Sequence, residues 1–351
     1  MSGALRVAIA GYGLAGEVFH APLVAATEGL ALVAVTTSDE RRAARARAAY
    51  HGVHVAPDAD ALLRDVDRID LLVVATPNRL HVDVARAALA RGIAVVVDKP
   101  LAVDADGAAA LVDDFAAARV PLTVFQNRRW DGDFLTVRRC LESGELGPVT
   151  RFESRYERFR PDVASERWRE HGDPAEGGGL LLDLGAHLVD QALALFGFPR
   201  RLYAEIAARR PDARVDDDVF VALEHDDGVR SHLWMSAVAP LGRRSLRASG
   251  TRAGIETRGL DPQEDQLAAG LRPGDPAWGA GEPARWIDAA GERTLATERG
   301  AYERFYAGVR DALRDGGDMP VDARDAVAAL RVIDAARRSA RTAAVIEMEE
   351  Q

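Results

Sequence analysis

The segment from Leu5 to Val24 constrains the fold most strongly, because it combines an apolar run, a glycine turn and a helical pattern. It reads LRVAIAGYGLAGEVFHAPLV, in which Gly11, Gly13 and Gly16 have the spacing G-x-G-x-x-G. In a dinucleotide site the first glycine permits a tight turn, the second lets the backbone approach a pyrophosphate, and the third lets helix pack on strand. The N-terminus of the following helix attracts an anion. A second apolar run, LALVAVTT, follows at residues 30–37, so we predict a strand–turn–helix–strand unit that binds a dinucleotide.

The alternation of strand and helix continues to about residue 125. Residues 69–81 read as a buried strand and a turn, residues 82–92 as a helix ending at Gly92, and residues 93–100 as another strand. A helix over residues 102–120 and a further strand, PLTVFQ, complete the pattern. This order predicts the α/β class, with a Rossmann NADP-binding domain over residues 1–125.

The second half of the chain has a different pattern. Short apolar runs between residues 148 and 250 predict strands at close spacing, and therefore an antiparallel or mixed sheet in an α+β domain. Residues 301–316 and 322–341 predict two amphipathic helices. Residues 261–283 are rich in glycine and proline and predict a long ordered loop. We assign residues 126–351 to this second domain, which we expect to bind substrate and to mediate oligomerisation.

The end of the second strand bears on the choice of cofactor. An NAD site usually places an acidic residue there to hold the ribose 2′-hydroxyl. This chain has Thr37 and Ser38 at that point, followed by Arg41 and Arg42, which suit a 2′-phosphate. We therefore predict NADP. NAD is the alternative, with Asp39 as an acid displaced along the chain.

Lys99 is the single lysine among 45 basic residues, and it lies at the end of the strand IAVVVDKP. Ligands of open α/β sheets bind just outside the carboxyl ends of the strands. Lys99 is thus expected on the same rim as the glycine turn and Thr76–Asn78. An amine is also a compact cation that can lose a proton, which a guanidinium effectively cannot do. We predict that Lys99 is a functional residue.

An apolar helix predicted after the three glycines at residues 177–179 carries a polar stripe. Asp183, His187 and Asp190 fall at positions i, i+4 and i+7, which share one helix face. A carboxylate one turn from an imidazole can fix its tautomer and raise its basicity, as a general base requires. The alternative is that Asp183 favours the first helical turn and that His187 is a core histidine. Together with Lys99 and a dinucleotide site, the pattern favours a catalytic role.

Composition excludes several classes of function. The net charge of −10 is spread along the chain, and no basic patch points to nucleic acid. A single cysteine, Cys140, excludes an internal disulfide and suggests a reducing compartment, the cytoplasm. We expect no signal peptide and no membrane association, since no apolar run approaches the length of a membrane helix. His51 and His54 lack further clustered ligands, so we expect no metal.

Two motifs carry a resemblance to a known family. The chain resembles the Gfo/Idh/MocA oxidoreductases over nearly its whole length. The family's Glu-Lys-Pro motif appears as Asp98–Pro100, and its Asp-x-x-x-His motif appears as Asp183 and His187. Asp98 keeps the charge of the family's glutamate but shortens its reach. Several stretches, including GYGLAGEVFHAPL, QNRRWDGDFLTVRR and DPQEDQLAAG, are more closely similar to one subgroup, the NADP-dependent scyllo-inositol dehydrogenases.

The resemblance implies reversible hydride transfer between a substrate carbinol carbon and nicotinamide C4. His187 would take the hydroxyl proton, Lys99 would hydrogen-bond the same oxygen and contact the cofactor, and Asp183 would orient His187 or bind a neighbouring hydroxyl. The implied substrate is a cyclic polyol or a sugar. The resemblance also implies a large, open, mostly antiparallel second sheet, through which we expect a homodimer or homotetramer. The alternatives are glycoside cleavage with a tightly held NAD and a nucleotide-sensing regulator without catalysis.

These arguments give two sets of contact residues. The predicted cofactor contacts are Gly11, Tyr12, Gly13, Leu14, Ala15, Gly16, Thr37, Ser38, Arg41, Thr76, Pro77, Asn78, His81, Lys99 and Pro100. The predicted substrate contacts are Asn127, Arg128, Trp130, Tyr156, Arg160, Trp168 and Arg169, since polyols need many donors and an aromatic or two. For Trp130 and Trp168 the alternative is a place in the core. His20 is expected to be structural.

Overall fold

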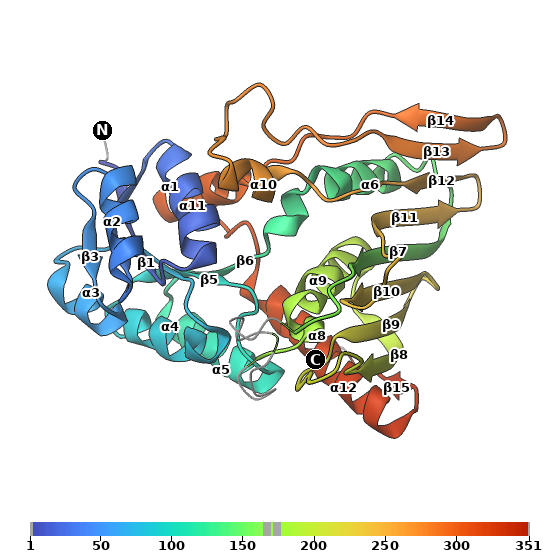
Figure 1. Ribbon diagram of the computed structural model, residues 1–351, viewed down its shortest axis with the longest axis horizontal. Helices are drawn as coiled ribbons and strands as arrows, with labels where there is room; N and C mark the ends of the chain where they lie inside the picture. Colours follow the sequence, from blue (N-terminus) through green and yellow to red (C-terminus); the bar gives the residue numbers. More distant parts are fainter. Residues whose placement is uncertain (1–2, 164–169, 171–176, 350–351) are drawn as a thin grey trace.

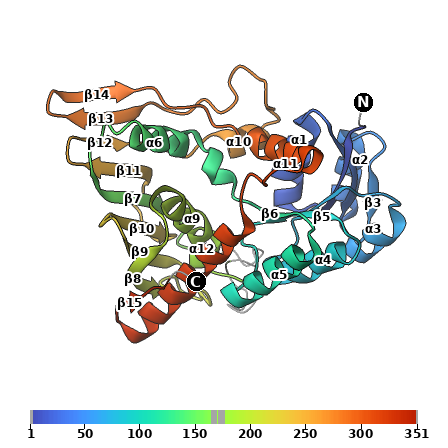
Figure 2. The ribbon, with the colours of Figure 1, turned by 180° about the vertical axis from the view of Figure 1, so that it is seen from behind.

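The computed structural model describes residues 3–163, 170 and 177–349 (Figure 1). Among these residues it contains a six-stranded sheet formed by the first part of the chain and a nine-stranded sheet formed by the second. The two sheets lie at opposite ends of the molecule in both views (Figures 1 and 2), and helices pack against each of them. The expected combination of a Rossmann domain and an α+β domain with a large, mostly antiparallel sheet is confirmed.

The first sheet is parallel throughout and has the strand order β3-β2-β1-β4-β5-β6. Its strands are β1 (Leu5–Ala10), β2 (Leu30–Thr36), β3 (His54–Ala56), β4 (Leu71–Val74), β5 (Ala94–Asp98) and β6 (Leu122–Phe125). All four residues of β4 are fully buried, because helices cover both faces of the sheet. Leu72 and Val74 belong to one core cluster and Leu71 and Val73 to another, as the alternation of side chains along a strand requires.

Short helices connect these strands. They are the π-helix η1 (Ala15–His20), α1 (Ala21–Ala26), α2 (Glu40–Ala49), α3 (Ala59–Asp65), the 3₁₀ turn η2 (Asn78–Leu80), α4 (His81–Leu89) and α5 (Ala105–Ala118). Asp39, Asp58 and Asp104 each precede a helix and accept hydrogen bonds from its first backbone amides. A cap of this kind stabilises a helix by about 1 kcal/mol. The caps fix where α2, α3 and α5 begin at the rim of the sheet.

The second sheet has the order β14-β13-β12-β11-β7-β10-β9-β8-β15 and is antiparallel except between β7 and β10. Its strands are β7 (Val149–Glu157), β8 (Pro199–Ala207), β9 (Asp218–His225), β10 (Arg230–Ser236), β11 (Arg244–Gly250), β12 (Ala253–Glu256), β13 (Ala284–Asp288), β14 (Gly291–Leu295) and β15 (Ile346–Glu347). Burial alternates along β9 and β10, so one face packs on helices and the other stays partly exposed. The sequence patterns identified β7 to β11 and missed the four shorter strands.

Helices from the second half of the chain cover one face of the second sheet, and some of them also contact the domain of the first sheet. They are the 3₁₀ turn η3 (Asn127–Trp130), α6 (Gly132–Glu142), α8 (Leu180–Asp183), α9 (Gly185–Phe196), α10 (Gln263–Ala268), α11 (Glu303–Asp315) and α12 (Ala323–Thr342). α12 packs against β8, α5 and α9. α11 lies beside α1, as Figures 1 and 2 both show, so a late segment completes the core of the Rossmann domain.

Two sequence expectations need correction. The predicted loop at residues 261–283 contains α10, in which Gln263 is fully buried and exchanges hydrogen bonds with Trp130 and Tyr302. The glycines and prolines around this helix hid its short apolar pattern. The helix predicted after the three glycines is divided at Leu184 into α8 and α9, with Gly179 at a positive φ of 97° before α8.

Candidate active site

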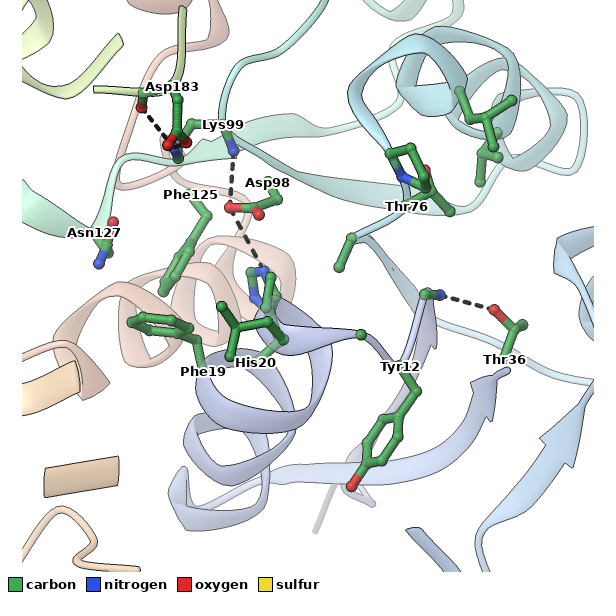
Figure 3. Close-up of a pocket in the computed structure, with 18 of the residues that line it drawn as sticks. Tyr12, Phe19, His20, Thr36, Thr76, Asp98, Lys99, Phe125, Asn127 and Asp183 are labelled. Carbon is green, nitrogen blue, oxygen red and sulfur yellow. Dashed lines mark hydrogen bonds and ion pairs between the residues drawn. The ribbon is translucent and has the colours of Figure 1, made fainter. Parts of the chain in front are cut away.

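A pocket of about 1200 Å³ lies at the carboxyl ends of β1, β4 and β5 and extends to the second sheet. Figure 3 shows part of it: the side chains of Lys99 and Asp183 point toward each other, while Tyr12 and Thr36 lie by the glycine turn. The glycine turn and the polar residues predicted to be catalytic therefore line one cavity, as expected for a topological switch point of a Rossmann sheet.

The pocket brings together most of the residues predicted from the sequence. Those that line it are Gly11, Tyr12, Gly13, Leu14, Ala15, Thr37, Ser38, Thr76, Pro77, Lys99, Asn127, Arg128, Tyr156, Arg160, Asp183 and His187. Those that do not line it are Gly16, Arg41, Asn78, His81, Pro100 and Trp130. Trp168 and Arg169 lie outside the described residues.

The glycine turn fits a dinucleotide on steric grounds. Gly11 has a φ of 105°, and a Cβ there would collide with the backbone carbonyl of Ala75. A Cβ at Gly16 would collide with the carbonyl of Gly11, so these two positions require glycine for packing. A Cβ at Gly13 would meet nothing within 4 Å. The second glycine therefore faces open space, where phosphate oxygens could approach the backbone amides at the start of η1.

At the end of the pocket predicted to bind the adenosine, the lining differs from the sequence expectation in one residue. Arg42 lines the pocket and Arg41 does not, because successive helical residues point about 100° apart. Asp39 is the cap of α2, and its carboxylate accepts hydrogen bonds from the amides of Arg41 (2.8 Å) and Arg42 (3.0 Å). Both amides lower the pKa of the Asp39 carboxyl, and the amide of Arg42 contributes most. Its carboxylate is thus engaged in capping the helix.

Lys99 and Asp183 form an ion pair at the opposite end of the pocket. The ammonium Nζ donates to Asp183 Oδ1 at 2.9 Å and to the Asp183 carbonyl at 2.7 Å. The Lys99 side chain is 13% exposed. The Lys99–Pro100 peptide bond is cis. The strand end of β5 and the end of α8 therefore hold one ammonium group at the pocket wall.

His187, on α9, is buried beside this ion pair. Its Nδ1 has no hydrogen-bond partner among the described residues. Burial, and then the cations Lys99 and Arg128, hold the pKa of His187 well below its usual 6.5. This corrects the expectation of raised basicity, because the Asp183 carboxylate pairs with Lys99. The imidazole is neutral at pH 7 and is able to accept a proton.

Asp190, the third member of the predicted stripe, does not line the pocket. It is 2% exposed and receives hydrogen bonds from Arg129 Nη2 (2.6 Å) and Nε (2.8 Å). Arg129 also pairs with Asp325 at the start of α12. The three residues of the stripe therefore have different surroundings. Asp183 and His187 line the pocket, whereas Asp190 binds Arg129 and so connects α9 to η3.

His20 lies beneath the Lys99 loop, where the sequence predicts a structural residue. Its Nδ1 is 2.6 Å from the hydroxyl of Tyr306 on α11, and its Nε2 is 3.9 Å from Asp98 Oδ1 (Figure 3). Burial lowers the pKa of His20 to about 4, so the ring is neutral. Asp98 Oδ1 also accepts the backbone amide of Lys99 at 2.9 Å. His20 thus lines the pocket and borders the carboxylate that precedes Lys99.

His81 and Asn78 support the rim from behind. The His81 ring nitrogens lie 2.8 Å from the carbonyl of Pro100 and 2.9 Å from that of Thr76, so the ring connects the loops after β4 and β5. Asn78 donates to the carbonyl of Gly177 at 3.1 Å. These residues hold the pocket rim in place without lining it. Trp130 is partly buried and packs edge-on against Phe305 at the border of the core, which is close to the alternative that the sequence left open.

Sequence reasoning missed several polar residues of the pocket wall. They are Arg158, Glu170, Arg210, Asp216 and Glu264. Asp216 accepts the amide of Leu181 at 2.7 Å and so holds the start of α8. Glu264 lies on α10 and Arg158 follows β7, and the five residues are far apart in the sequence and form no motif of their own. Charge alone could not distinguish them from surface residues in an Arg-rich chain.

Other classes of site are less well supported in the part of the chain that the structure describes. It contains no group of three or more histidine, cysteine or carboxylate side chains placed to hold a metal ion. Within the same residues, none of the helices is both long and apolar enough to cross a membrane.

Comparison with known proteins assigns the chain to a family. Residues 5–126 match the description "Oxidoreductase family, NAD-binding Rossmann fold", and residues 138–348 match "Oxidoreductase family, C-terminal alpha/beta domain". The chain belongs to the Gfo/Idh/MocA oxidoreductase family. It is an oxidoreductase with an NAD(P)-binding Rossmann domain, as the sequence motifs indicated.

Relatives within the Gfo/Idh/MocA family match the chain over almost its full length. The uncharacterised oxidoreductase YdgJ of Escherichia coli is 39% identical, with 99% of each chain covered. The scyllo-inositol 2-dehydrogenase (NADP(+)) IolW of Bacillus subtilis is 31% identical, with 98% of this chain and 96% of IolW covered. The structure of an oxidoreductase from Bacillus cereus superposes with a TM-score of 0.86 at 27% identity, covering 99% of each chain.

Proposed function

We propose that the protein is an NADP(H)-dependent dehydrogenase that oxidises a secondary alcohol of a cyclic polyol or sugar. The observation that carries the proposal is the pairing of Lys99 with Asp183 beside His187, in the same pocket as the glycine turn. The similarity to IolW, which is named as an NADP-dependent scyllo-inositol dehydrogenase, supports this substrate class.

Three residues of the chain would have separate roles in this reaction. The neutral imidazole of His187 accepts the proton of the substrate hydroxyl. The ammonium of Lys99 donates a hydrogen bond to the same oxygen and stabilises the negative charge that develops there. Asp183 holds the ammonium at the pocket wall, since its carboxylate and its carbonyl both accept from Nζ. The bound nicotinamide supplies the hydride acceptor.

The test is NADPH formation by the purified protein with a panel of inositols, aldoses and sugar alcohols. NADP and NAD are assayed in parallel. We expect a clear rate with one polyol or sugar, accompanied by stoichiometric production of NADPH. Turnover of a glycoside without net cofactor consumption would favour the glycosidase alternative. Nucleotide binding without any turnover would favour a sensor.

Arg42 provides the test of cofactor preference. Replacing Arg42 with alanine is expected to raise KM for NADP about tenfold and to leave KM for NAD nearly unchanged, because a charge-assisted contact with the 2′-phosphate is lost. Arg41→Ala is the matched control, since Arg41 does not line the pocket. An equal rise of KM for both cofactors in the Arg42 variant would contradict the assignment to the 2′-phosphate.

We further propose that a second copy of the chain covers the outer face of the nine-stranded sheet. Phe220, His232 and Trp234 lie on its partly exposed face, and the guanidinium of Arg155 lies 3.6 Å from the ring centroid of Trp234. Such a stacked aromatic patch suits a homo-oligomeric interface. Light scattering should give the mass of a dimer or tetramer, and the mass of a single chain would contradict this.

The localisation remains a proposal from composition. Cys140 is buried and free, which suits a reducing compartment such as the cytoplasm. Fractionation of cells that produce the protein would test it, and recovery in an oxidising compartment would contradict it.

A further inference from the structure

The cations of the pocket wall at the proposed substrate end differ in whether they form ion pairs. Most of the cations there have a carboxylate partner: Lys99 pairs with Asp183, Arg128 with Asp131 and Glu264, and Arg210 with Asp217 and Glu170. Arg158 and Arg160 also line the pocket, but among the described residues neither has a carboxylate partner. Neither guanidinium therefore forms an ion pair with a described carboxylate, although the charges of Asp183 and Glu170 favour the Arg158 cation and Arg160 is exposed.

The backbone holds these two arginines in a fixed register. They follow β7 on an extended segment, where the amide of Arg158 donates to the carbonyl of Ser236 (2.9 Å) and that of Arg160 to the carbonyl of Ala237 (2.7 Å). Phe159, between them, forms an isolated bridge with Val238 and is 55% exposed. Because side chains alternate along extended backbone, Arg158 and Arg160 share the side that faces the pocket.

One donor of the Arg158 guanidinium lacks an acceptor. Its Nε is buried and has no hydrogen-bond partner among the residues that the structure describes. Burial and the neighbouring charge of Arg160 lower the pKa of Arg158, which means that its surroundings disfavour the cation. Buried donors in folded proteins normally have a partner. A ligand with an anionic oxygen would supply the missing acceptor and a negative charge beside both guanidinium groups.

We infer that Arg158 and Arg160 form an anion subsite, and that the substrate is a polyol or sugar that also carries a carboxylate or phosphate group. This inference rests on the proposed function, because the oxidised hydroxyl is placed at Lys99 and His187 in the same pocket. The planar fork of a guanidinium suits bidentate contact with either kind of acidic group. The acidic group would anchor the substrate at a distance from the carbon that is oxidised.

Matched pairs of compounds test the inference. Glucuronate is compared with glucose, glucose 6-phosphate with glucose, and an inositol monophosphate with inositol, each with NADP. We expect kcat/KM to be about 10- to 100-fold higher for an acidic member of these pairs, the usual range for a hydrogen bond to a charged group. The carboxylate and phosphate arms identify which acidic group is used. Equal or higher kcat/KM for every neutral member would overturn the inference.

Variants assign the effect to the subsite. Arg158→Gln should lower kcat/KM for the acidic substrate about 10- to 100-fold and leave that for its neutral partner and the Kd of NADPH nearly unchanged. Arg158→Lys should restore part of the loss. Arg243→Gln is the matched control, since Arg243 is exposed near the same strand ends and lies outside the pocket. Equal losses for the acidic and neutral partners in Arg158→Gln would overturn the assignment.

A binding measurement separates failure of the subsite from failure of the proposed function. Isothermal titration of the same compounds into the NADP-loaded protein needs no turnover. Tighter binding of an acidic compound that is lost in Arg158→Gln, without oxidation, would keep the subsite and count against the dehydrogenase proposal. Oxidation of neutral compounds with no preference for acidic ones would keep the dehydrogenase and overturn the subsite.

Discussion

Replacing His187 with glutamine is expected to lower kcat for polyol oxidation by about 10²- to 10⁴-fold, the usual contribution of a general base. Glutamine is polar and of similar size, but it does not accept a proton at neutral pH. His187 is buried in the pocket wall beside Lys99 and Arg128, and its neutral imidazole is the proposed acceptor of the hydroxyl proton. Steady-state rates at saturating substrate and NADP measure the loss.

Two controls accompany the His187 variant. The Kd of NADPH, followed by fluorescence, should change less than threefold, because His187 lies at the substrate end of the pocket. The melting temperature should show that the variant is folded. A folded variant that keeps kcat within threefold of the original would exclude His187 as the general base.

The pH profile tests the same assignment independently. Burial and the cations Lys99 and Arg128 lower the pKa of His187, so the proton-accepting form persists below pH 6.5. The activity is present above this pKa and is lost as the pH falls through it, so the acid limb of kcat/KM should lie below pH 6.5. Removing the charge in Lys99→Met should move that limb to higher pH. An acid limb that stays in place would contradict the coupling between the two groups.

Replacing Lys99 with arginine is expected to lower kcat by about 10²- to 10³-fold, although the charge is kept. The ammonium fits between two acceptors of Asp183, at 2.9 Å from Oδ1 and 2.7 Å from the carbonyl, and has a third donor for the substrate oxygen. A planar guanidinium is larger and presents its donors as a rigid fork, so it cannot reproduce this arrangement. The same steady-state assay measures the loss.

A control variant tests whether an exchange between lysine and arginine lowers kcat at a position outside the pocket. Arg138→Lys alters a largely exposed residue on α6 that forms an i,i+4 pair with Glu142, and it should leave kcat unchanged. Asp183→Asn should lower kcat as well, and the Lys99 and Asp183 losses should be less than additive if the two residues act as a unit. Near-normal turnover by Lys99→Arg would refute the catalytic role of the ammonium.

Features with a local pattern could be predicted from the sequence. The glycine turn, the buried parallel strands and the position of Lys99 at a strand end all depend on residues close together in the chain. The short elements β3, β12 and α10 were not predicted, because each has too few residues to show a periodic pattern. The helix after the three glycines was predicted as continuous because its apolar residues give no sign of the break at Leu184.

The fold class and the glycine turn thus follow from the sequence alone, which also predicts the Lys99, Asp183 and His187 set as catalytic. The tertiary structure decided which charged groups meet. It pairs Asp183 with Lys99 and Asp190 with Arg129, and it brings Tyr306 against His20 across 286 residues of sequence. The physical reason is that strand and helix periods follow from neighbouring residues, whereas an ion pair or an unpaired guanidinium depends on which faces of distant elements pack together.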